Sequence, residues 1–186
     1  MIDYEKIFMD YCAENGLAIS LSYDMPAGYE NANGMFDPAV NTLFINKDFL
    51  KDLPDYEQMF YLFHELRHAL QYLCSERFDA RILKSRQYVI MYDGHCYKLV
   101  QEEWKECVLE GSTEYFSALY LGQPYEADAN EFAYEKVKSI CGESVALDDL
   151  HFFGFQRYKS QIVNMKNYMP RLMKKHDKPA NNSHVR

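Results

Sequence analysis

His64-Glu65-Leu66-Arg67-His68 fits the pattern H-E-x-x-H. Residues i and i+4 lie one helical turn apart on the same face, so both imidazoles can bind one Zn²⁺ at about 2.0–2.1 Å. Glu65 comes directly after His64 and projects from the adjacent face of the helix, where its carboxylate can take a proton from a metal-bound water. We therefore predict that His64 and His68 bind zinc and that Glu65 is a general base.

The residues around this motif predict a helix. Pro54 suits a first helical turn, and Asp52 or Asp55 could cap it. Apolar residues recur at spacings of three and four, which is typical of a helix with one buried face. This stripe consists of Met59, Leu62, Phe63, Leu66, Ala69, Leu70 and Leu73. At 100° per residue the two histidines lie opposite the stripe, alongside Tyr61, Gln71 and Ser75. We expect the stripe to face the core and the histidines to face another part of the protein.

Length and charge limit the class of protein. A chain of 186 residues can form one substantial core, and we expect a single domain over residues 1–175 with a disordered tail over 176–186. The net charge of −8 argues against nucleic-acid binding through a basic surface. The start of the chain has no apolar run typical of a signal peptide, and no stretch approaches the ~20 apolar residues of a membrane span. We therefore expect a cytoplasmic protein without membrane or nucleic-acid partners.

The five cysteines show no C-x-x-C spacing. In a cytoplasmic protein they are expected to be reduced thiols that mostly contribute to packing. Cys74 and Cys96 lie near the motif in sequence, so a thiolate ligand is a minor alternative.

The remaining patterns predict an α+β fold. A small twisted sheet with a hairpin edge strand is expected to pack on the motif helix, followed by several helices. The expected elements are a helix over 3–15, strands over 17–23 and 42–46, and helices over 75–88, 97–121, 125–141 and 155–174. Asn33-Gly34 suits a type I′ hairpin turn. The strand over 42–46 could be an edge strand that holds an extended substrate.

A catalytic zinc needs a third protein ligand, and two acidic clusters compete for this role. The first contains Glu110 and Glu114; the second contains Glu126 and Asp128. The alanines Ala127, Ala129 and Ala133 would let the second cluster approach the motif helix closely. We therefore favour Glu126, with Glu110 or Glu114 as the alternative. Asn130 lies one turn after Glu126 and could orient a ligand, and Asp128 could be an alternative ligand or accept a hydrogen bond from a histidine.

The motif, together with Glu126-x-x-Ala129-Asn130-x-Phe132-Ala133, resembles the zincin metallopeptidases of the ImmA/IrrE type, which many bacteria, phages and mobile elements encode. The segments 34–38 and 43–46 also resemble the edge-strand hairpin of that family. In those proteins the glutamate of E-x-x-A-N-x-F-A completes a gluzincin-like zinc site.

The resemblance implies a zinc-dependent endopeptidase with one Zn²⁺, which cleaves a specific cytosolic protein, such as a regulator. Glu65 would pass the proton of the attacking water to the leaving amine. The donor to the carbonyl oxygen is open, with Tyr134, His95 and His151 as candidates. The alternatives are a catalytically silent zincin-like protein that binds a partner and another zinc hydrolase, such as an amidase.

Overall fold

A computed structural model describes residues 2–90, 95–101 and 103–142 and shows the predicted α+β fold. Its first sheet is mixed and three-stranded, with the order β1–β3–β2. The strands are β1 (Ser20–Ser22), β2 (Gly34–Asp37) and β3 (Thr42–Ile45). β1 runs parallel to β3, and β2 runs antiparallel to it. β3 is therefore the central strand, and the prediction that residues 42–46 form the edge is wrong: the edge beside the motif helix is β2.

The hairpin that joins β2 to β3 turns later than the sequence suggests. Asp37 pairs with Thr42, so the turn spans residues 38–41, and Asn41 adopts the positive φ of 48° that it requires. Asparagine tolerates this conformation better than most residues. The prediction of a turn at Asn33-Gly34 is wrong, because Gly34 already belongs to β2.

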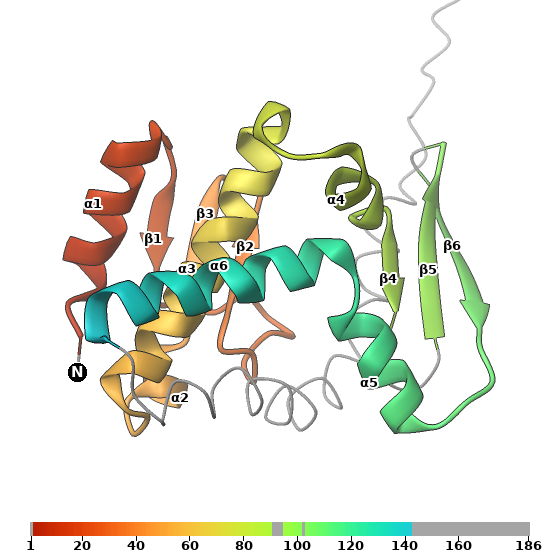
Figure 1. Ribbon diagram of the computed structural model, residues 1–186. Helices are drawn as coiled ribbons and strands as arrows, with labels where there is room; N and C mark the ends of the chain where they lie inside the picture. Colours follow the sequence, from red (N-terminus) through yellow and green to blue (C-terminus); the bar gives the residue numbers. More distant parts are fainter. Residues whose placement is uncertain (1, 91–94, 102, 143–186) are drawn as a thin grey trace, which may run out of the picture.

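Helices cover the sheet and each other. α1 (Tyr4–Asn15) begins after the cap Asp3 and ends at Gly16, whose φ is 67°. The short α2 (Lys47–Leu50) leads into α3 (Asp55–Leu73), which carries the motif and begins after Pro54. α6 (Pro124–Cys141) crosses α3 on the side away from the sheet (Figure 1). The packing of α3 against α6 is the most extensive between any two described elements.

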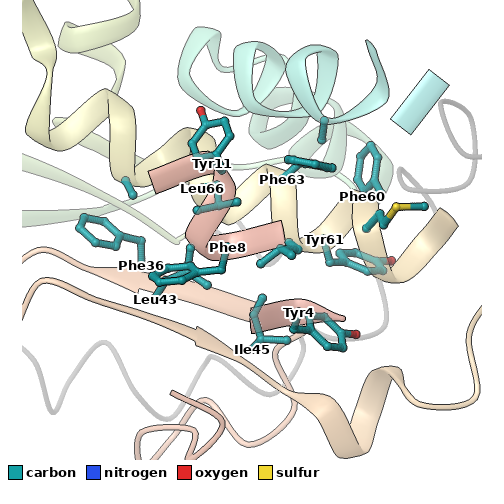
Figure 2. Packing of buried hydrophobic residues seen from close by; sticks show 14 of the residues in the cluster. Tyr4, Phe8, Tyr11, Phe36, Leu43, Ile45, Phe60, Tyr61, Phe63 and Leu66 are labelled. Carbon is teal, nitrogen blue, oxygen red and sulfur yellow. The ribbon is translucent and has the colours of Figure 1, made fainter. Parts of the chain in front are cut away.

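The hydrophobic core lies between α1, the sheet and α3 (Figure 2). Leu43 and Ile45 of β3 and Leu62 and Leu66 of α3 are fully buried. The predicted stripe on α3 thus faces the core, except for Leu73, which is exposed near the end of the helix.

The other side of α3 is covered by α6. Ala129 and Ala133 have no exposed surface, so small side chains do permit the close approach of the two helices. Ala127 is exposed and takes no part in it. As a result His64 and His68, which lie opposite the core stripe, are buried as well.

After α3 the chain departs from the predicted run of helices. The short helices η1 (Ser75–Arg77) and α4 (Ala80–Ser85) lead into an antiparallel sheet, which precedes α5 (Thr113–Leu121). This sheet consists of β4 (Tyr88–Ile90), β5 (His95–Val100) and β6 (Glu103–Val108). The helix predicted over 75–88 is therefore present as two short helices, whereas the helix predicted over 97–121 is wrong except at its end, where α5 lies. The helix predicted over 155–174 and the tail over 176–186 lie outside the described residues.

Cysteine usage also differs from expectation. Cys96 is disulfide-bonded, and Cys107 lies opposite it in the β5–β6 register, so the expectation of reduced thiols is wrong for Cys96. Cys12, Cys74 and Cys141 are free. None of the described helices is both long and apolar enough to cross a membrane.

Candidate metal centre

Three buried donor atoms converge between α3 and α6. His64 Nε2 and His68 Nε2 lie 2.9 Å apart. Glu126 Oε2, in the first turn of α6, lies 3.6 Å from the first nitrogen and 3.7 Å from the second. All three residues are buried, and within the described part of the chain they form the single His/Cys/Asp/Glu group able to hold a metal ion.

The geometry of this group fits a zinc ion. A point equidistant from the three atoms lies about 2.0 Å from each, which matches the 2.0–2.1 Å bonds of imidazole nitrogen and carboxylate oxygen to Zn²⁺. Glu126 Oε2 is buried and has no hydrogen-bond partner. A buried carboxylate oxygen without a donor is costly, and a cation at this point would satisfy it. The three residues could therefore hold a metal ion.

Without metal, the three groups set each other's protonation. Burial lowers the pKa of His64 to about 3, and the nearby His68 adds to the shift. Burial acts most strongly to lower the pKa of His68, but the Glu126 and Glu65 carboxylates and the hydrogen bond to Gln71 together outweigh it and raise that pKa. For Glu126, burial favours the neutral acid, yet the facing histidines and a hydrogen bond with Tyr120 together outweigh it and lower the pKa. Metal ligands must be deprotonated to bind, so a metal ion would compete with protons for these three groups.

Glu65 lies beside this group, between α3 and the edge strand β2. Its side chain is buried and accepts a hydrogen bond from the backbone N–H of Phe36. A Cβ at Gly34 would come within 2.9 Å of Glu65 Cγ, so the strand approaches the side chain as closely as a glycine allows. Burial raises the pKa of Glu65 to about 7. A carboxyl group with this pKa can both accept and release a proton near neutral pH.

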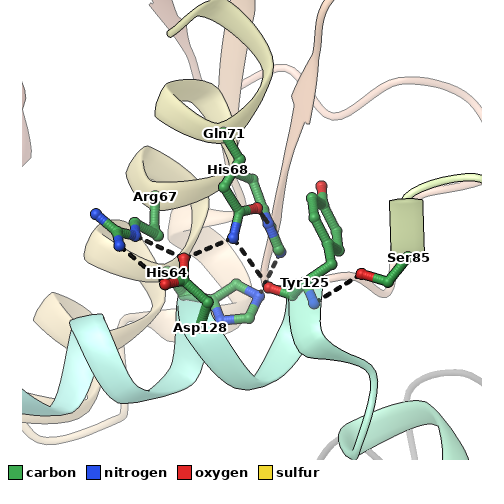
Figure 3. A network of polar contacts seen from close by, with 7 residues as sticks. All are labelled: His64, Arg67, His68, Gln71, Ser85, Tyr125 and Asp128. Atoms are coloured by element: carbon green, nitrogen blue, oxygen red, sulfur yellow. Dashed lines mark hydrogen bonds and ion pairs between the residues drawn. The ribbon is translucent and has the colours of Figure 1, made fainter. Parts of the chain in front are cut away.

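A polar network on the far side of His68 connects α3 with α6 (Figure 3). His68 Nδ1 lies 2.8 Å from Gln71 Oε1, and Gln71 Nε2 donates to the Tyr125 carbonyl and to Asp128 Oδ2. Asp128 also forms a bidentate ion pair with Arg67: Arg67 Nε donates to Asp128 Oδ2 at 2.7 Å, and Arg67 Nη2 donates to Oδ1 at 2.9 Å. Asp128 is therefore not among the converging donors; it reaches His68 through Gln71.

Sequence reasoning missed Gln71, Arg67 and Tyr125 as parts of this site. The ring of Tyr125 stacks on His68 with centroids 4.2 Å apart and an angle of 14° between the planes. A usable signal was present for Gln71, because it lies on the histidine face of the helical wheel, three residues after His68. Nothing in the sequence alone indicated Arg67 or Tyr125.

The other candidate residues lie in different places. Asn130, one turn after Glu126, is hydrogen-bonded to His64. Glu110 is exposed between β6 and α5 and is not part of the converging group. Glu114 belongs to α5 by its backbone, but its side chain is outside the described part of the structure.

The candidate oxyanion donors do not gather at the histidines. His95 on β5 forms a 2.7 Å pair with Glu106. Tyr134 packs against the hydrophobic core, with Lys138 5.9 Å from the ring centroid. His151 lies outside the described residues.

Comparison of the chain with protein families, with curated proteins and with solved structures gives no match.

Proposed function

We propose that the protein is a zinc-dependent metallopeptidase whose metal ligands are His64, His68 and Glu126 and whose general base is Glu65. The observation that carries this proposal is the combination of a buried three-donor group with a buried carboxyl group beside it, whose pKa is about 7. The ImmA/IrrE-type resemblance of the two motifs points in the same direction. The substrate on this proposal is a protein or peptide.

Each residue has a defined part in peptide hydrolysis. A bound Zn²⁺ would supply Lewis acidity for water and for the scissile carbonyl. Glu65 accepts a proton from the water as its oxygen attacks the carbonyl carbon. When the C–N bond breaks, Glu65 gives the same proton to the leaving nitrogen. Its burial against β2 excludes bulk water from this carboxyl group, so the proton is transferred within the site.

The edge strand β2 offers a place for the substrate backbone. The Phe36 N–H donates to Glu65, so on this strand the outward-facing backbone groups lie beside the base. An extended peptide that pairs with an exposed sheet edge is held by main-chain hydrogen bonds, independently of most of its sequence. A peptide added to β2 would therefore place one of its carbonyl groups near Glu65.

The test compares the wild-type protein with Glu65→Gln. Both are expected to bind one zinc, measured by metal analysis. The variant should lose hydrolysis by roughly 10²–10⁴-fold, because the base is absent, measured on a mixture of unstructured peptides with mass spectrometry of the products. A wild-type protein without stoichiometric zinc would contradict the proposal. If the wild type and Glu65→Gln both bind zinc and neither cleaves peptides, the alternative is favoured: a zincin-like protein that acts by binding a partner.

The third ligand is tested by a pair of glutamate variants. Glu126→Ala is expected to abolish stoichiometric zinc binding, whereas Glu110→Ala removes the same group from an exposed site and should leave binding unchanged. The opposite pattern would exclude Glu126 as the ligand.

A further inference from the structure

We propose that Gln71 is a positioning residue that fixes the tautomer of His68 and the location of Glu126. This inference rests on the metal centre proposed above, but it concerns a residue that neither binds the metal nor belongs to the H-E-x-x-H pattern. Gln71 has no exposed surface, so water does not compete for its hydrogen bonds.

The direction of the Gln71 amide follows from its neighbours. The Tyr125 carbonyl, 3.0 Å away, and the Asp128 carboxylate, 2.8 Å away, can only accept hydrogen bonds, so the NH₂ group must face them. The amide oxygen then faces His68 Nδ1 at 2.8 Å and must receive a hydrogen from it. His68 therefore carries its proton on Nδ1, and in the neutral ring the lone pair of Nε2 points toward Glu126 and His64. This is the tautomer that binds a metal through Nε2.

The same amide also positions the third ligand. Gln71 Nε2 holds the carbonyl of Tyr125, the residue directly before Glu126, in the first turn of α6. The Tyr125 ring in turn stacks on His68. The Gln71 side chain thus contacts both His68, the ligand on α3, and the residue next to Glu126, the ligand on α6.

Arg67 and Asp128 keep this amide in place. Asp128 accepts from Gln71 and from two nitrogens of Arg67, so its carboxylate cannot turn away without breaking an ion pair. The guanidinium lies between the rings of Phe78 and Phe132, at 4.6 and 4.7 Å from their centroids. These contacts restrict the position of Asp128 and hence that of Gln71.

The chain supplies a matched control for Gln71. Gln58 is on the same helix, is 1% exposed, accepts a hydrogen bond from the Tyr4 hydroxyl at 3.1 Å and donates to the Leu53 carbonyl at 2.7 Å. Gln58→Met and Gln71→Met remove the same groups from similarly buried places. A general loss of stability would appear in both variants, whereas a positioning effect would appear only in Gln71→Met.

The experiment measures Zn²⁺ affinity by competition with a chromophoric chelator, and Co²⁺ absorption as a report of ligand geometry. Gln71→Met is expected to weaken Zn²⁺ binding by about 10–100-fold and to change the Co²⁺ spectrum. Gln58→Met should stay within about 3-fold of the wild type with an unchanged spectrum. Wild-type affinity in Gln71→Met, or an equal loss in both variants, would overturn the inference.

A second measurement does not depend on whether the variants fold. In the ¹⁵N-labelled wild-type protein, long-range ¹H–¹⁵N spectra should show a slowly exchanging proton on His68 Nδ1, with or without zinc. A His68 that lacks this proton would overturn the inference. If the wild type binds no zinc, the proposed function fails, and the metal-free spectrum, recorded at a pH at which His68 is neutral, still tests the tautomer that Gln71 is proposed to fix.

Discussion

Buried polar side chains in this protein differ in whether the protein itself satisfies them. Gln58 has a donor and an acceptor within hydrogen-bond distance, and Gln71 has three partners. Glu126 Oε2 is equally buried but makes no hydrogen bond. Most buried polar atoms are paired in native proteins, so an unpaired one needs a reason. At Glu126 the two imidazole nitrogens supply that reason, because together the three atoms suit a cation.

A second unpaired atom, the Tyr11 hydroxyl, belongs to the core instead. Tyr11→Phe is expected to raise the free energy of unfolding by about 1 kcal/mol at pH 7, because it removes an unsatisfied buried group. Burial raises the pKa of Tyr11 to about 12, above the ~10 of an unfolded tyrosine. The wild type should therefore lose stability as the pH rises from 10 to 12, and the variant should lose less. Urea denaturation at pH 7 and 11 measures both effects.

Tyr4→Phe is the matched control for Tyr11. The Tyr4 hydroxyl donates to Gln58, and burial also raises its pKa to about 12. Removing this hydroxyl leaves Gln58 Oε1 without its donor, so we expect a loss of about 1–2 kcal/mol. If Tyr11→Phe destabilised the protein as much as Tyr4→Phe, the Tyr11 hydroxyl would have to be hydrogen-bonded in solution.

At the scale of elements, β2 packs closely against α3 at Gly34. A Cβ there would lie 2.9 Å from Glu65 Cγ, 2.9 Å from the Phe44 carbonyl oxygen and 3.0 Å from Ile45 Cδ1. Gly34→Ala must therefore displace the strand or the Glu65 side chain. We expect it to lower the free energy of unfolding by about 1–3 kcal/mol and hydrolysis by roughly 10²-fold, with zinc content unchanged.

Gly111→Ala serves as the control for this substitution. Its Cβ would meet the side chains of Tyr115 and Phe116, outside the metal centre, so hydrolysis should be unaffected. If Gly34→Ala retained full hydrolysis, the close contact of β2 with Glu65 would have no part in the reaction.

How far the sequence predicts these elements depends on how local their signals are. α3 was predictable because its apolar stripe follows directly after Pro54, and α6 because Pro124 and Gly142 mark its ends. The β5–β6 hairpin was not, because its glutamates recur at a spacing that also suits a helix. Its turn also lacks the usual glycine or asparagine: Gln101 takes the positive φ of 51°. The pairing of β5 with β6 is evident only in the three-dimensional structure.

In the candidate site, too, some residues could be predicted from the local sequence and others could not. His64, Glu65 and His68 follow from five consecutive residues, and Glu126 follows from its alanine neighbours. The role of Gln71 depends on the register between two helices whose contacting residues, Gln71 and Tyr125, lie 54 positions apart. No local pattern determines that register; it results from the packing of Ala129 and Ala133 against α3.

In the molecule as a whole, α3 is the shared support of the site. On one side it packs on the sheet that supplies the edge beside Glu65, and on the other it packs on α6, which supplies Glu126. The site is therefore complete only when α6 is docked, and a ligand that binds all three donors favours the docked state. Metal binding and the stability of the α3–α6 contact should be coupled.

Removal of zinc is expected to destabilise the whole fold through this coupling. At free zinc about 100-fold above the dissociation constant, binding adds about 2.7 kcal/mol, which for a chain of this size raises Tm by roughly 5–10 °C. Calorimetry with zinc and after chelation measures the shift, and hydrogen exchange should show the largest loss of protection in the first turn of α6. Glu126→Ala is the control, because without the third donor its Tm should respond little to zinc. A zinc-loaded wild type whose Tm and α6 exchange do not change on chelation would show that the ion does not connect the two helices.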